Sequence, residues 1–257
     1  MLRKTVLGFA LMLMFNGHAL ADIITVINHS FEDITGEVPF NEFTFGPLAG
    51  WDLYDPGNIT NGGAGNTFFI GTLSPTAPMF FSSGAPDGNR VAIAFNFFGS
   101  GGLGEYGLRQ SLTSTLQANT TYTLQVEIGN IASGSSTNGT PFNLDGFPGY
   151  RIDLLAGTQV IASDNNSLSG SISNGMFATS TMQFTTNSNP SGLGQALGIR
   201  LVNLNQVDPL IPNSDLEVDF DNVRLSAITA IPEPGGLQMI MVATILLSVR
   251  RGHRGDH

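Results

Sequence analysis

The chain has 257 residues, a formal net charge of −10 and no cysteine. Without cysteine it forms neither disulfides nor thiolate metal sites, and its acidic balance argues against binding the phosphate backbone of nucleic acids. Charged residues make up only 12% of the chain, against roughly 25% in ordinary globular proteins, and its 32 glycines favour short strands joined by many turns.

The first 21 residues have the features of a secretory signal peptide. Arg3 and Lys4 precede an apolar run over residues 6–15, and small residues at 19–21 match what signal peptidase accepts. We expect signal peptidase to cleave before Asp22, so that the protein is exported across the inner membrane. An uncleaved anchor is the less favoured alternative, because the apolar run is shorter than the ~20 residues of a membrane span.

The part of the chain from residue 22 to residue 230 shows the alternation of β-strands and no helical period. In residues 121–128 apolar and polar side chains alternate, as in an antiparallel strand with one solvated face. Residues 150–162 predict a hairpin that turns near Gly157. Many short strands with Gly- and Asn-rich turns indicate one all-β domain, an antiparallel β-sandwich of the jelly-roll kind.

The last predicted strand, residues 215–225, changes phase. Its apolar side chains slip by one position around Asp221. A β-bulge and a simple strand end both explain such a slip, and the sequence leaves the two open.

Catalytic motifs are weak. Residues 99–104 match the dinucleotide fingerprint G-x-G-x-x-G, but a predicted strand follows them instead of a helix, so we interpret them as a loop. His29 is the one histidine between residues 22 and 230, which leaves little support for a Ser-His-Asp site. A glycoside hydrolase would need two carboxylates about 5–10 Å apart. The glutamates available for such a pair are Glu32, Glu105, Glu127 and Glu217.

None of these glutamates stands out. Glu127 and Glu217 fall on the expected polar faces of strands, which predicts solvated side chains. We therefore expect a protein that is not an enzyme, with hydrolysis by paired carboxylates as an alternative.

Two acidic stretches favour a structural calcium ion over other metals. Calcium takes roughly six to eight oxygen ligands from carboxylates and backbone carbonyls. Glu32 lies near the start of the domain, and Asp219 and Asp221 lie near its end. The alternative is that these are ordinary surface acids.

Aromatic residues next to polar ones indicate a possible sugar-binding surface, since sugar rings stack on aromatic side chains. The candidates are Trp51, Tyr54, Phe147, Tyr150 and Arg151. A lone tryptophan in a β-sandwich is more often part of the core, and this alternative stays open for Trp51.

The C-terminal tail has three parts in a fixed order. They are Pro232, Glu233 and Pro234, an apolar segment over residues 237–249, and Arg250 and Arg251. This order closely resembles the PEP-CTERM sorting signal. The resemblance implies a short transmembrane helix, recognition and processing by an exosortase, transient anchorage in the membrane, and a final place at the cell surface or in an extracellular matrix.

The ends of the domain also resemble a known family. "ITVINHSFED" and "VDFDNVRLSA" are similar to the boundary strands of galactose-binding-like jelly rolls, including many carbohydrate-binding modules. The resemblance implies a calcium ion held by Glu32 and Asp221, with Asp219 as the alternate ligand.

Together these features predict a signal peptide (1–21), a β-sandwich ectodomain (22–230) and a sorting signal (231–257). The expected function is that of an exported surface or matrix protein that binds polysaccharide. A purely structural matrix protein and a glycoside hydrolase are the alternatives.

Overall fold

The computed structural model describes residues 21–60, 62, 68–76, 79–97 and 104–230. The expected signal peptide lies almost entirely outside these ranges, and the whole sorting motif (Pro232, Glu233, Pro234, Arg250 and Arg251) and the expected membrane helix at 237–249 lie outside them. Among the residues that are described, no helix is long and apolar enough to cross a membrane. Transient membrane anchorage and export therefore stay predictions.

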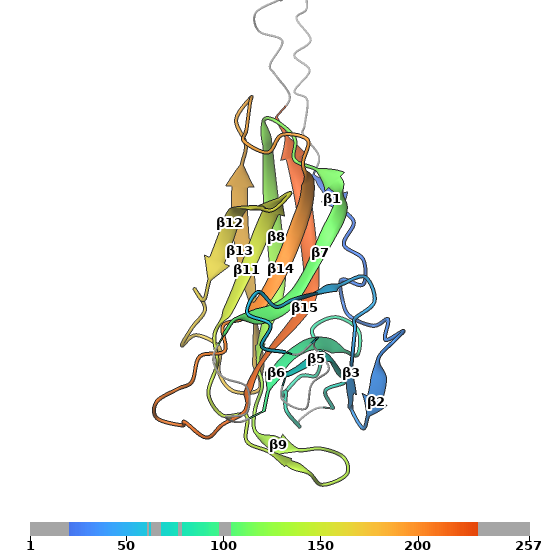
Figure 1. The fold of residues 1–257 in the computed structure, drawn as a ribbon, viewed down its shortest axis with the longest axis vertical. Coiled ribbons are helices and arrows are strands. Elements are labelled where there is room, and N and C mark those ends of the chain that lie inside the picture. Colours follow the sequence, from blue (N-terminus) through green and yellow to red (C-terminus); the bar gives the residue numbers. More distant parts are fainter. Residues whose placement is uncertain (1–20, 61, 63–67, 77–78, 98–103, 231–257) are drawn as a thin grey trace, which may run out of the picture. The chain divides into compact units, whose positions relative to one another are not determined.

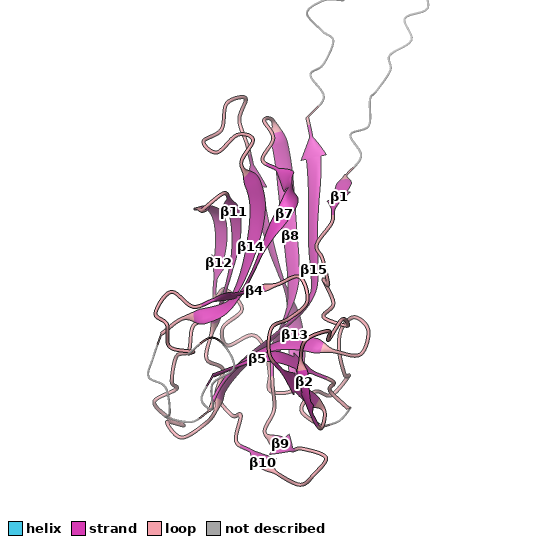
Figure 2. Cartoon of the chain, turned by 45° about the vertical axis from the view of Figure 1, so that its right-hand side comes forward, coloured by secondary structure: helices cyan, strands magenta, loops and turns pink. Residues whose placement is uncertain are grey.

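The described part of the chain is built from antiparallel β-strands (Figures 1 and 2). The larger sheet has the order β13-β8-β15-β6-β5-β3-β2, and β1 pairs with β15. Its strands are β1 (Asp22–Ile24), β2 (Val38–Phe40), β3 (Phe43–Phe45), β5 (Phe68–Leu73), β6 (Val91–Asn96), β8 (Thr120–Asn130), β13 (Met176–Thr185) and β15 (Leu216–Thr229).

The smaller sheet has the order β12-β11-β14-β7-β4. Its strands are β4 (Asp52–Tyr54), β7 (Tyr106–Thr115), β11 (Tyr150–Ala156), β12 (Gln159–Asn165) and β14 (Ala196–Asn203). Two short strands, β9 (Gly134–Ser135) and β10 (Pro141–Phe142), form a separate hairpin. The prediction of an all-β antiparallel sandwich is confirmed, whereas the finer assignment to a jelly roll stays a prediction.

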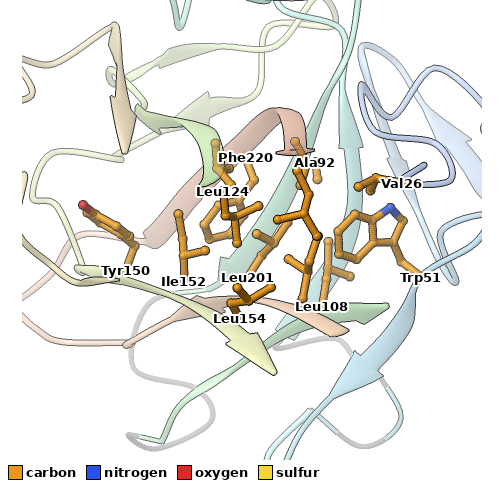
Figure 3. Close-up of a cluster of buried hydrophobic side chains, with 14 of the residues drawn as sticks. Val26, Trp51, Ala92, Leu108, Leu124, Tyr150, Ile152, Leu154, Leu201 and Phe220 are labelled. Carbon is orange, nitrogen blue, oxygen red and sulfur yellow. The ribbon is translucent and has the colours of Figure 1, made fainter. Parts of the chain in front are cut away.

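The main core lies between the two sheets (Figure 3). Leu124 of β8 and Phe220 of β15 meet Ile152 of β11 and Leu201 of β14 in one cluster of buried side chains. Because successive side chains of a strand point to opposite faces, each of these strands contributes every second residue to this core. The β11–β12 hairpin turns at Gly157, which has a positive φ of 60°, as the sequence predicts.

A second cluster covers the opposite face of the larger sheet. All six residues of β6 are buried, since Ala92 and Ala94 face the main core while Ile93 and Phe95 face the second cluster. We call it the outer cluster. Its buried members are Phe43, Leu73, Phe80, Phe81, Val91, Ile93, Phe95, Ile131 and Leu144, and Phe142, Phe177 and Met79 are among the residues packed against them.

The phase slip near Asp221 is a β-bulge. The pairing of β15 with β8 shifts register between Asp221 and Arg224, and Asn222 has a positive φ of 50°. Since β15 continues to Thr229, the alternative of a strand end is excluded.

Candidate active site

Two acidic side chains of β15 face the outer cluster. Glu217 pairs with Phe95 and Asp219 pairs with Ile93 across the β15–β6 ladder. Directly opposed residues of an antiparallel pair project to the same face of the sheet. Both carboxyls therefore point toward the apolar side chains of the outer cluster, while Val218 between them enters the main core.

This acid pair is fully buried. Glu217 is 2% exposed and Asp219 is 0% exposed, and among the described residues the carboxyl of Asp219 has no hydrogen-bonding neighbour besides Glu217. Burial raises the pKa of Glu217 to about 8; hydrogen bonding with Asp219 opposes this rise, and the charge of Asp215 adds to it. Burial and the adjacent Glu217 raise the pKa of Asp219 well above its usual range. Burial therefore favours the neutral, protonated form of these carboxyls.

Burial of Glu217 predicts a pH-dependent stability. The folded state keeps this proton up to about pH 8, whereas the unfolded chain releases it near 4.5. The folded state binds more protons in this window, so the contribution of Glu217 lowers the free energy of unfolding as the pH rises from about 4.5 to about 8. We expect Glu217→Gln to remove this fall and to exceed the wild type in stability at pH 8 by a few kcal/mol.

Urea unfolding at pH 4, 6 and 8 measures this effect. Glu127→Gln is the matched control, because Glu127 lies near the surface beside Arg224 at 3.6 Å. A Glu217→Gln protein with the same pH dependence as this control would contradict the assignment of a buried, protonated Glu217.

Aromatic rings of the outer cluster lie on the same face of the larger sheet as the acid pair. Phe142 lies 5.5 Å from Phe43 and 6.4 Å from Phe95, measured between ring centroids. Phe81 and Phe177 stack at 4.2 Å. The faces of such rings carry partial negative charge and attract cations. A proton donor among aromatic rings is suited to acid chemistry on a small apolar molecule.

A glycine brings one of these rings close to the acid pair. Gly129 pairs with Asp219 across the β15–β8 ladder. A Cβ atom at Gly129 would lie 2.6 Å from the Phe177 ring and 2.9 Å from the Cβ of Asp219. Any side chain at this position would displace the Phe177 ring from its place beside Asp219.

Sequence reasoning missed this site. It placed Glu217 on a solvated strand face and gave no role to the buried phenylalanines of the outer cluster. The available signal was the run Val91–Asn96, whose apolar residues do not alternate with polar ones. Such a run is typical of a strand that is buried on both faces, and β6 is the neighbour of β15.

The predicted calcium ligands fall into two places. Glu32 Oε1 accepts hydrogen bonds from the backbone N–H groups of Asn89 and Arg90, each at 2.7 Å. Asp221 Oδ2 accepts one from the backbone N–H of Asp87 at 2.8 Å. The two acids thus meet the same loop, whereas Asp219 lies with Glu217. Within the described ranges, no group of three or more ligand-type residues is arranged to hold a metal ion.

Three predicted sugar-binding aromatics pack into the main core. Trp51 is 5% exposed and donates its indole N–H to the carbonyl of Asn28 at 3.3 Å. The buried Tyr150 donates its hydroxyl to Asp164 at 2.6 Å. Phe147 is partly buried against the same core. These side chains stabilise the sandwich and present no platform for a sugar.

The other two candidates belong to a polar network on the outer face of the smaller sheet. Tyr54 donates its hydroxyl to Glu105 at 2.7 Å, and the Arg200 guanidinium lies 4.6 Å from the centre of its ring. Arg151 forms ion pairs with Glu105 and Asp153. Their polar groups are thus engaged within the protein.

Comparison with known proteins identifies the family. A family model described as HpiC1-like, HpiC1 cyclase, matches residues 22–226. The structure of an apo cyclase from Fischerella sp. is 38% identical, with a TM-score of 0.67, and the match covers 82% of this chain and 98% of that one. A search of curated proteins found no match.

Two further structures from Fischerella sp. TAU contain indole compounds. The Stig cyclase Fisc, in complex with (3Z)-3-(1-methyl-2-pyrrolidinylidene)-3H-indole, is 37% identical, with a TM-score of 0.68 and coverage of 82% of this chain and 100% of that one. A cyclase in complex with 4-(1H-indol-3-yl)butan-2-one is 36% identical, with a TM-score of 0.67 and coverage of 82% and 99%.

These relatives overturn the function expected from the sequence. The predictions of a polysaccharide-binding surface protein, a structural matrix protein, a glycoside hydrolase and an exosortase substrate are wrong, and so is the prediction that the chain is not an enzyme. The C-terminal tail suggested sorting, and aromatic and acidic residues within the domain suggested sugar binding or hydrolysis, whereas the family match covers that whole domain. The chain belongs to the HpiC1-like family of cyclases.

Proposed function

We propose that this protein is a cyclase that closes a ring in a small, indole-bearing substrate. The observation that carries the proposal is the buried Glu217–Asp219 pair facing the aromatic rings of the outer cluster. We call this arrangement the acid–aromatic site. It consists of Glu217 and Asp219 with Phe43, Phe80, Phe81, Phe95, Phe142 and Phe177. The indole compounds bound by two relatives support the substrate class.

The acid pair supplies a proton and takes one back. A neutral carboxyl donates its proton to a π bond or heteroatom of the substrate, which leaves a cation on the substrate. A second π bond of the same molecule attacks this cation, and the new ring bond forms. A proton then leaves the cyclised cation for the carboxylate, which restores the acid. Substrate and product are isomers, so the reaction consumes no co-reactant.

The aromatic rings stabilise the charge that the proton transfer creates. A cation close to the face of an aromatic ring gains about 2 kcal/mol or more when water is excluded. Exclusion of water also prevents hydration of the cation before the ring closes. An acid pair on a solvated surface would lack both effects.

Conversion of an indole-bearing precursor tests the proposal. The full-length protein is incubated with open-chain indole compounds, and chromatography with mass spectrometry detects a product of unchanged mass. Calorimetry with 4-(1H-indol-3-yl)butan-2-one measures binding independently of turnover. A protein that neither binds this ketone nor isomerises any indole precursor would contradict the proposal.

We infer that calcium stabilises the fold beside Glu32 and Asp221. Burial raises the pKa of Asp221 to about 8, and Asp87 and Glu32 add negative charge around it. A bound cation would offset this repulsion, and oxygen atoms of carboxylates and carbonyls are the ligands that calcium prefers. Glu32 and Asp221 would supply carboxylate oxygens to such an ion beside the loop Asp87–Arg90, whose backbone N–H groups they contact.

Calcium is therefore expected to raise the melting temperature. A free concentration of 100 Kd would add about 2.7 kcal/mol to the free energy of unfolding. Asp221→Asn should lose most of this gain, while Asp52→Asn, at an exposed edge of the other sheet, should keep it. Scanning calorimetry with calcium and with chelator measures both. An equal melting temperature in the two buffers would contradict the inference.

A further inference from the structure

The β9–β10 hairpin is a small element held mainly at its two ends. In the described part of the chain, its strands pair only with each other. At its base, the backbone N–H of Ala132 donates to the carbonyl of Phe80 at 3.0 Å. The N–H of Leu144 donates to the hydroxyl of Ser133 at 2.9 Å. These contacts fix where the hairpin leaves the body of the protein, but they do not fix its tip.

The carboxylate of Glu42 holds the tip. Thr137 lies in the loop between β9 and β10, and its backbone N–H lies 3.1 Å and 3.2 Å from the two carboxyl oxygens of Glu42. The Thr137 hydroxyl donates to Glu42 Oε2 at 2.9 Å. Glu42 is 8% exposed, which strengthens these charge-assisted bonds relative to bonds on the surface.

Glu42 is itself firmly placed. It lies in the turn between β2 and β3, and the backbone N–H of Ser74 donates to its carbonyl at 2.8 Å. The Arg90 guanidinium reaches the same carbonyl at 3.5 Å. The hairpin tip is therefore attached to the β2–β3 turn at the edge of the larger sheet.

The hairpin also carries part of the acid–aromatic site. Phe142 ends β10, and its ring lies 5.5 Å from Phe43 and 6.4 Å from Phe95. Phe95 is the cross-strand partner of Glu217. Movement of the hairpin would thus carry the Phe142 ring away from the rings that surround the acid pair.

We propose that Glu42 is a positioning residue of this cyclase. Through Thr137 it holds the β9–β10 hairpin closed, so that Phe142 stays in the wall of the acid–aromatic site. The effect on turnover rests on the proposed function, whereas the attachment of the hairpin by Glu42 does not.

Hydrogen exchange on the full-length protein tests the attachment itself. In Glu42→Ala, the amides of residues 134–142 should exchange roughly 10- to 100-fold faster, because hydrogen bonds to a buried carboxylate are lost. Amides of β8 and β15 should be unchanged. Glu42→Gln keeps an acceptor oxygen and should show a smaller increase. Glu127→Ala is the control that removes a carboxylate from another part of the same sheet.

A second variant tests the same contact from the other side. Thr137→Val removes the hydroxyl donor and should speed exchange of the hairpin severalfold without altering Glu42. Thr137→Val also tests the attachment of the hairpin if the Glu42→Ala protein fails to fold. Unchanged exchange of residues 134–142 in the folded variants would overturn the proposal.

Kinetics separate positioning from a general loss of structure. Glu42→Ala should raise KM for an indole substrate and change the ratio of cyclised products more than it lowers kcat, and Glu42→Gln should restore much of both. If the wild type turns over no substrate but exchange responds as expected, the proposed function fails while the attachment stands. If the wild type is active and Glu42→Ala leaves KM and products unchanged, the positioning role fails.

Discussion

Glu217→Gln and Asp219→Asn are each expected to lower the rate of cyclisation by roughly 10²–10⁴-fold, the usual contribution of a positioned general acid. Both variants keep the volume of the side chain and remove the proton that the buried pair holds. The fold should persist, because neither carboxyl stabilises the folded state when it is ionised in an apolar surrounding. Initial rates with an indole precursor, together with melting curves, measure the two effects separately.

The matched control is again Glu127→Gln. Glu127 lies on β8 of the same sheet, and its carboxylate accepts a hydrogen bond from Thr179 at 2.8 Å near the surface. This variant should retain the wild-type rate. Full activity in the Glu217 and Asp219 variants would place the reaction elsewhere in the molecule, whereas a loss of activity together with a large drop in melting temperature would indicate only a structural role.

Asp153→Ala is expected to cause the largest loss of stability among simple polar substitutions, about 3 kcal/mol or more. Asp153 is 1% exposed and accepts hydrogen bonds from Arg151 at 3.1 Å, Arg200 at 3.0 Å and Ser163 at 2.7 Å. Its removal leaves two guanidinium groups without their shared carboxylate. Each arginine side chain is less than 20% exposed, so water replaces this partner poorly.

The edge of the same sheet offers a matched control. Arg109 and Asp52 lie 3.9 Å apart, and both side chains are largely exposed. Asp52→Ala should therefore change the free energy of unfolding by less than about 0.5 kcal/mol. Urea titration measures both variants. Equal losses in the two would show that burial of Asp153 does not determine its contribution.

The strands were predictable because their signals are local. Alternation of apolar and polar residues in 121–128 corresponds to β8, and the turn at Gly157 joins β11 to β12. The phase slip at Asp221 corresponds to the bulge in β15. Each of these features depends on the geometry of one strand or one turn, which neighbouring residues in the sequence dictate.

The candidate ligands were only partly predictable, because their positions depend on contacts between segments that are far apart in the sequence. The resemblance to galactose-binding-like domains implies one calcium ion held by Glu32 and Asp221. Both side chains meet one loop, whereas Asp219 interacts with Glu217. Trp51 and Tyr150 lie in the core, where the sequence showed only aromatics near turns. The patterns at the ends of the chain did not indicate a cyclase. Membership of the cyclase family follows from the match over residues 22–226.

The sequence alone determined that the protein is an antiparallel β-sandwich and which side chains of each strand share a face. Only the tertiary structure decided which faces are covered. Alternation in β15 places Glu217 and Asp219 on the face opposite to Val218 and Phe220. The sequence of this strand would be the same whether the acidic face met water or aromatic rings. That choice depends on segments far away in the chain, such as β6 and the outer cluster, and burial of the acids in turn raises the pKa of Glu217.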